Sequence, residues 1–130
     1  MHKGVFVVLV NCTDASREEE FNRWYTHTHL PDLSKTKGLV RARRFRRLRS
    51  DKGESSGYMT LYEFDSDNLS DSMKDFMRLV GETFASGRHI DCFDVVGLHL
   101  FEEIDPKSLE PLREVNYPKQ VPGAQPTPEW

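Results

Sequence analysis

The chain has 130 residues, a formal net charge of −3 and a hydrophobic fraction of 37%. This length fits one compact domain, and the acidic balance argues against non-specific binding of nucleic acid. Cys12 and Cys92 lack the spacing of a zinc site or a disulfide framework, and we interpret them as reduced thiols. The apolar run at the N-terminus, Val5–Val10, is too short to cross a membrane. We therefore expect a cytoplasmic protein with neither a membrane nor a nucleic-acid partner.

The first third of the chain predicts a strand followed by a helix. Val5–Val10 is a β-branched apolar run and is typical of a buried strand. The polar cluster Thr13–Ser16 is suited to capping a helix. Pro31 is expected to end this helix near Leu30, because a residue before proline avoids the helical region. One face of the helix carries four residues at helical spacing: Phe21, Trp24, Tyr25 and Thr28.

The rest of the chain predicts two strands, a second helix and a last strand. Leu39–Leu48 is a charged strand, and Tyr58–Phe64 alternates in the manner of a strand. Gly87 is a plausible terminator of the second helix, and Phe93–Ile104 is the fourth strand. The apolar face of the second helix carries Met73, Phe76, Met77, Val80 and Phe84.

The order β-α-β-β-α-β predicts a ferredoxin-like α+β fold, with two helices on one face of a four-stranded antiparallel sheet. We assign this domain to residues 1–104. Residues 105–130 hold six of the seven prolines and form a proline-rich extension that either closes the pocket, wraps a partner subunit or is disordered. Because the other face of the sheet also carries apolar residues, we expect a homodimer through the sheet faces.

Strict alternation along the strands assigns side chains to the two faces of the sheet. In the last strand it places His99 on the same face of the sheet as Phe93 and on the other face from Leu98. In the second strand it places Arg43 with Leu39, and Arg44 on the other face.

Four segments together resemble a known family: Phe21–Tyr25, His29–Asp32, Gly38–Val40 and Ala42–Phe45. They are similar to the EthD-like members of the dimeric α+β barrel superfamily, over about residues 3–104. The resemblance implies a homodimer with one pocket per subunit between the sheet and the helices. It also implies acid–base chemistry on a small aromatic or carbonyl-bearing molecule. Relatives include polyketide cyclases, cofactor-free monooxygenases, isomerases, haem-degrading enzymes and stress proteins.

His27 and His29 form an H-x-H pair that does not predict a metal site. Residues two apart on a helix are about 200° apart in projection, so both side chains cannot readily face one ion. His29 lies about 40° from Tyr25 and borders the buried face, whereas His27 points to solvent. No metal or cofactor is predicted.

His29, Asp32 and Tyr25 are the candidate catalytic residues. His29 is either a pocket acid/base or a residue that interacts with the helix dipole. Asp32 either orients His29 by accepting a ring N–H or caps the next turn. Tyr25 either donates its hydroxyl to a substrate carbonyl or is a core aromatic.

The candidate substrate-binding residues lie on several elements: Arg43, His99, His89, Trp24 and Tyr62. One arginine of the charged strand is expected to bind a carboxylate or an enolate, and the alternative is a solvated strand with salt bridges. His99 is either a pocket base or a satisfied core or interface histidine.

These patterns predict a cofactor-independent enzyme that performs acid–base chemistry next to a carbonyl, as an isomerase, cyclase, dehydratase or decarboxylase, on an aromatic or polyketide-like molecule. The alternatives are a cofactor-free monooxygenase of phenols and a non-catalytic ligand-binding or stress protein. The lyase and isomerase classes are favoured at this stage.

Overall fold

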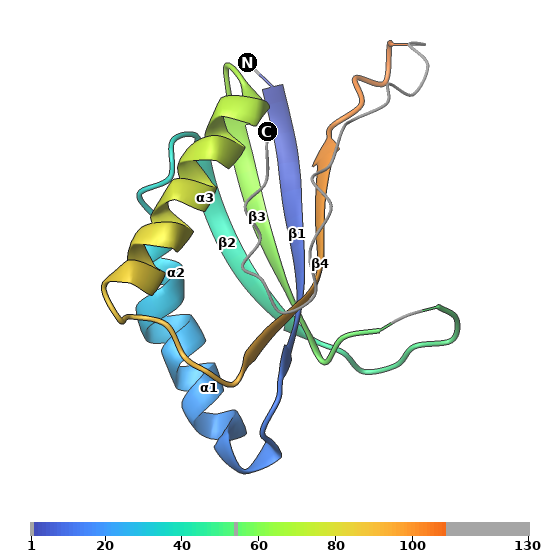
Figure 1. The fold of residues 1–130 in the computed structure, drawn as a ribbon. Helices are drawn as coiled ribbons and strands as arrows, with labels where there is room; N and C mark the ends of the chain where they lie inside the picture. The colour runs from blue at the N-terminus through green and yellow to red at the C-terminus, as the bar shows by residue number, and fades with distance from the viewer. Residues whose placement is uncertain (1, 54, 109–130) are drawn as a thin grey trace.

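A computed structural model of the chain describes residues 2–53 and 55–108. Four strands form one antiparallel sheet in the order β2-β3-β1-β4, and the helices lie on one face of it (Figure 1). The predicted ferredoxin-like α+β fold is therefore confirmed. The predicted extension lies outside the described residues from position 109 on. The strands are β1 (His2–Cys12), β2 (Leu39–Arg46), β3 (Tyr58–Ser66) and β4 (Phe93–Glu102).

The first helical segment is longer than predicted and changes its winding. Asp14, from the predicted capping cluster, accepts a hydrogen bond from the Ser16 backbone and caps a short 3₁₀ turn (Ala15–Arg17). Three helical stretches then follow without a break: α1 (Glu18–Trp24), a π-helical turn (Tyr25–His29) and α2 (Leu30–Leu33).

The expectation that Pro31 ends the helix near Leu30 is wrong. The π-helical turn closes when the backbone N–H of Leu30 donates to the carbonyl of Tyr25, five residues earlier. Pro31 then stands in the first turn of α2, where a missing N–H is tolerated. The chain therefore stays helical to Leu33.

The second helix, α3 (Leu69–Ala85), ends just before the predicted terminator Gly87. Asn68 accepts a hydrogen bond from the Asp71 backbone N–H at the start. Gly87 adopts a positive φ of 75° just beyond the end, as a helix terminator should. Met73 and Phe76 are buried against the sheet, and Phe76 packs edge-on against Phe6 of β1 with ring centroids 5.2 Å apart.

A β-bulge in each of β2 and β4 overturns the predicted facing of several side chains. In β4, Gly97 pairs with Leu9 and Val95 with Val10, so Val96 is an extra residue. Val95 therefore shares the helix-side face with Leu98, and His99 is left on the opposite face.

The bulge in β2 has the same effect at Val40. Leu39 pairs with Phe64, but Arg41 pairs with Glu63. Leu39 and Arg44 therefore share the helix-side face, whereas Arg43 lies on the opposite face. Strict alternation fails at both strands because each bulge inserts one unpaired residue.

Gly38 permits the close approach of the turn before β2 to α3. Its φ is 81°, and a Cβ atom there would lie 2.9 Å from the Cβ of Ser66 and 3.0 Å from the hydroxyl of Ser72. Gly38→Ala is expected to lower the free energy of unfolding by about 1–3 kcal/mol, because it combines a left-handed backbone with a steric clash.

Chemical denaturation measures this change. Gly81→Ala is the matched control, since no atom lies within 4 Å of a Cβ at that exposed helix position. It is expected to be stabilising by about 0.5–1 kcal/mol. Equal effects at the two glycines would contradict the role given to Gly38.

No helix within residues 2–53 and 55–108 has the length and apolar character needed to cross a membrane.

Candidate functional site

A pocket lies between the sheet and the helices, where the family resemblance places it. It holds about 370 Å³ of space not filled by atoms, part of which is open to solvent. Its walls are almost wholly apolar, and polar groups come from Tyr25, His29 and Tyr62. Ligand pockets typically combine apolar walls with a few placed polar groups. The remaining lining residues are Val8, Phe76, Met77, Val80, Phe84, Phe93, Val95 and Leu98.

His29 is a buried neutral imidazole in the wall of this pocket. Its exposed fraction is 5%, and its Nδ1 has no hydrogen-bond partner within the described residues. The ring stacks on Trp24 at 4.7 Å and meets Tyr25 edge-on at 4.9 Å. Burial lowers the pKa of His29 from 6.5 to about 4, because a charged imidazolium would be desolvated there.

Tyr25 and His29 are four residues apart in the π-helical turn, so their side chains meet on one side of the helix. Such turns are wider than an α-helical turn and occur often at functional sites. Both residues belong to this turn and both are buried, whereas His27 between them is exposed. The predicted separation of the two histidines is confirmed.

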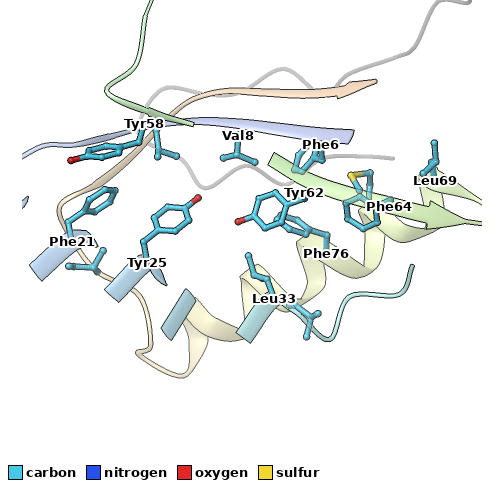
Figure 2. Close-up of a cluster of buried hydrophobic side chains, with 14 of the residues drawn as sticks. Phe6, Val8, Phe21, Tyr25, Leu33, Tyr58, Tyr62, Phe64, Leu69 and Phe76 are labelled. Atoms are coloured by element: carbon cyan, nitrogen blue, oxygen red, sulfur yellow. The ribbon is translucent and has the colours of Figure 1, made fainter. Parts of the chain in front are cut away.

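The hydroxyls of Tyr25 and Tyr62 point toward one another inside the core (Figure 2). Both are buried, and neither has a hydrogen-bond partner in the part of the chain that the structure describes. They nonetheless lie near enough to interact with each other and with the hydroxyl of Thr60. Burial raises the pKa of both tyrosines, and the nearby Tyr25 raises that of Tyr62 further. Both therefore remain neutral hydrogen-bond donors at physiological pH.

Asp32 does not orient His29. Its two carboxylate oxygens accept hydrogen bonds from Arg88 at 2.8 and 3.0 Å. No hydrogen bond joins Asp32 to His29 among the described side chains, and Arg88 holds the pKa of Asp32 below its usual value. The carboxylate instead binds the loop between α3 and β4.

Trp24 and His89 lie at the border of the pocket and do not line it. The Trp24 indole donates to the carbonyl of Arg88 at 2.8 Å, and its ring stacks on His29 and also contacts Tyr25 and Phe93. His89 is exposed and stacks on Phe84 at 4.7 Å. Both contact a residue of the pocket wall, so either can affect a ligand only through that residue.

Arg43 and His99 lie on the face of the sheet away from the pocket. Arg43 is opposite Leu61, forms an ion pair with Glu63 at 3.4 Å and packs on Phe45. His99 is opposite Val7, the neighbour of the pocket residue Val8. Neither side chain therefore lines the pocket of its own subunit, because the bulges separate Arg43 from Leu39 and His99 from Phe93, the residues with which strict alternation grouped them.

Arg44 is the residue near the site that the sequence did not single out. It is opposite Thr60, on the helix-side face, and its guanidinium lies 4.4 Å from the Tyr25 ring centroid. Arg44 is one of six arginines between positions 41 and 49, and alternation placed it on the other face from Arg43, but the sequence did not show which of the two faces the pocket.

Within the described ranges, no three His, Cys, Asp or Glu side chains are grouped so that they could hold a metal ion.

Residues 4–85 match the model of a family described as a domain of unknown function, DUF4286. The chain belongs to this family. No curated protein matches it. The description of this family states no chemistry.

Solved structures resemble the chain over most of its length. An ethyl tert-butyl ether (EthD) family protein of Bacillus halodurans is 21% identical, with a TM-score of 0.53 over 80% of this chain and 100% of that chain. A DABB family protein of Mesorhizobium loti with a ferredoxin-like fold is 13% identical, with a TM-score of 0.51 over 81% of this chain and 98% of that chain.

A third structure, a candidate antibiotic biosynthesis monooxygenase of Bordetella bronchiseptica, is 13% identical, with a TM-score of 0.58 over 80% of this chain and 99% of that chain. At these identities the likeness is one of fold. This likeness confirms that the chain shares the fold of EthD-like and related ferredoxin-like proteins.

Proposed function

We propose that the protein is a small-molecule enzyme that removes a proton from an enolisable ketone or a phenol in the pocket between the sheet and the helices. One observation carries the proposal. Among the described residues, His29 Nδ1 and the hydroxyls of Tyr25 and Tyr62 are buried without a hydrogen-bond partner of normal geometry, and all three residues line the same apolar pocket. Leaving such groups unpaired costs about 1–3 kcal/mol each, and a polar ligand would supply the missing hydrogen bonds.

The roles follow from the charge states. Because the pKa of His29 is about 4, its imidazole is neutral and can accept a proton at physiological pH. The tyrosine hydroxyls are neutral donors and can stabilise the oxygen that becomes negative. A negative charge forming beside His29 would raise its pKa and assist the transfer.

Two reaction classes share this first step. An isomerase or lyase returns the proton elsewhere or expels a group, whereas a cofactor-free monooxygenase lets the carbanion react with oxygen. Nothing in the pocket favours the first class. The Bordetella structure is that of a candidate monooxygenase. For this reason we propose oxygenation of phenols as the second candidate function.

A proton-exchange assay tests the proposal without a known substrate. In deuterated buffer, the protein is expected to accelerate exchange at the carbon next to the carbonyl of 2-tetralone, followed by NMR. Oxygen uptake with 1,4-dihydroxynaphthalene would assign the monooxygenase reaction. Saturable binding of both compounds with neither reaction would instead indicate a ligand-binding protein.

We further propose that a second copy of the chain covers the sheet face away from the helices. The half-buried side chains of β1 and β3 on this face are mainly apolar, and Phe45 and Phe101 at its sides are 39% and 56% exposed. Sheets with two apolar faces need a cover on each. The apolar members on the two central strands are Val5, Val7, Leu9, Met59 and Leu61.

Leu61→Arg is expected to convert a dimer into a folded monomer, because it places a charge at the centre of this face. Light scattering after size exclusion measures the mass, and circular dichroism checks the fold. Ser70→Arg adds the same charge at an exposed position of α3 and should leave the dimer intact. A monomeric wild-type protein would contradict the proposed dimer.

A further inference from the structure

Arg44 is a half-buried cation without a carboxylate partner in the described parts of the chain. Its guanidinium donates to the Asn22 carbonyl at 3.3 Å, to the Asn22 side-chain oxygen at 2.9 Å and to the Thr26 hydroxyl at 3.1 Å. All three acceptors are neutral, and within residues 2–53 and 55–108 the buried Nε has no hydrogen-bond partner. A charge buried without a counter-charge is costly. Such groups are candidates for a functional role.

The rings around Arg44 connect it to the pocket. Its guanidinium carbon lies 4.4 Å from the ring centroid of Tyr25, 5.3 Å from Tyr58 and 5.7 Å from Phe21. These are cation–π distances. Tyr25 extends from this contact to its hydroxyl, which faces Tyr62 (Figure 2). A single aromatic ring, that of Tyr25, therefore separates Arg44 from the hydroxyls of Tyr25 and Tyr62.

The charge of Arg44 reaches the polar groups of the pocket. It favours the ionised form of Tyr25 and of Tyr62, although burial dominates and raises the pKa of both. It also disfavours a positive charge on His29. Because the region is largely sheltered from water, this field is weakly screened.

The nearby carboxylates do not cancel this field by direct pairing. Glu18 accepts a hydrogen bond from the Tyr58 hydroxyl and forms no ion pair with Arg44. Asp32 is bound to Arg88. The pocket thus has two neutral hydroxyl donors, a neutral imidazole and one positive charge behind them.

We propose that the pocket binds a phenol or an enolisable ketone as its anion, with the hydroxyls of Tyr25 and Tyr62 donating to the charged oxygen and Arg44 stabilising that charge through Tyr25. Arg44 is a positioning residue, since it acts through Tyr25. On binding, the hydroxyl proton of a phenol passes to bulk water and the electron pair of the O–H bond stays on the oxygen, so no oxidant or reductant is needed. The inference rests on the proposed function, because it assumes that the ligand occupies this pocket.

Nitrophenols test the inference because only their phenolates absorb visible light. Titration of the full chain with 4-nitrophenol and 4-nitro-1-naphthol, at a pH below the pKa of each compound in water, should produce the phenolate spectrum. The pKa of the bound phenol is then read from the spectrum as the pH is varied. Arg44→Gln is expected to weaken phenolate binding about tenfold. The pKa of the bound phenol should rise by about one unit, which corresponds to the same factor.

Three variants separate charge from structure. Arg44→Lys keeps the charge and should retain most of the phenolate preference. Arg44→Met is a second neutral variant should Arg44→Gln fail to fold. Arg46→Gln removes an equal charge from an exposed position of the same strand, and it should bind the phenolate as wild type does.

The outcomes are distinct. No binding of either phenol by the wild-type protein would contradict the proposed pocket itself. Binding with a bound pKa that Arg44→Gln leaves unchanged would overturn the role of Arg44 alone. Equal loss in Arg44→Lys and Arg44→Gln would also overturn it, because the hydrogen bonds of Arg44 and not its charge would then be responsible.

Discussion

His29→Gln is expected to slow proton exchange, or the turnover of a substrate once one is found, by about 10²–10⁴-fold, which is the usual contribution of a well-placed acid or base. Glutamine keeps a polar side chain in the pocket but cannot take up a proton. Because His29 is a wall residue with an unpaired Nδ1, the loss should fall mainly on the rate and only weakly on ligand binding. Exchange rates and binding constants measured in parallel separate the two effects.

His27→Gln is the matched control, because His27 lies on the same helical turn and is exposed. It should leave exchange unchanged. Thermal unfolding of both variants checks that the stack of His29 on Trp24 is not needed for folding. An unchanged exchange rate in a folded His29→Gln protein would remove His29 from the mechanism.

The fold was predictable because its elements have strong local patterns. Val5–Val10 has the composition of a buried strand, and α3 carries its apolar residues at helical spacing between the Asn68 cap and Gly87. The order of these elements then leaves few topologies. Within the pocket, Tyr25, His29 and Tyr62 were also predicted, since the first two lie on the buried side of one helix and Tyr62 lies in an alternating strand.

The positions of the other candidate site residues depend on β-bulges, which strict alternation along a strand does not predict. The bulges at Val40 and Val96 put Leu39 and Phe93 on the pocket side of the sheet, and they leave Arg43 and His99, which alternation had grouped with them, on the other face. Neither bulge has a glycine or proline at the unpaired residue to mark it. The bulge at Val40 changes the face of Leu39 and leaves Arg43 and Arg44 alternating. The prediction that Arg44 lies on the other face from Arg43 was therefore right. What the sequence did not indicate was that Arg44 is the arginine near the pocket.

Asp32 failed as a partner of His29 for a different reason. The pairing of Asp32 with His29 was predicted because the two residues are close in the sequence. Arg88, 56 residues from Asp32, instead donates two hydrogen bonds to the carboxylate. A bidentate arginine pair is stronger than a single bond to a neutral imidazole. Long-range partners of this kind are not visible in a local motif, and the result is a histidine that remains unpaired inside the pocket.

Burial of the neutral His29 is also expected to make stability depend on pH. In the unfolded chain a histidine is protonated below its ordinary pKa of 6.5, whereas folded His29 stays neutral down to about 4. Between these values the unfolded state binds more protons, so the free energy of unfolding rises with pH. The contribution is complete above 6.5 and is lost as the pH falls to about 4. It amounts to about 3 kcal/mol over this interval.

The upper part of this interval isolates His29 from the carboxylates. Arg88 lowers the pKa of Asp32, and the Lys37 backbone and Arg78 lower that of Asp75, both from 3.8, so their contributions are lost only at more acidic pH. Urea unfolding of wild type and His29→Gln at several values between pH 4.5 and 6.5 measures the difference. The wild-type slope should largely disappear in the variant. If the free energy of unfolding changed with pH equally in wild type and His29→Gln, His29 would be hydrated and protonated in the folded protein. The proposal that His29 is a neutral base in the pocket before a ligand binds would then be wrong.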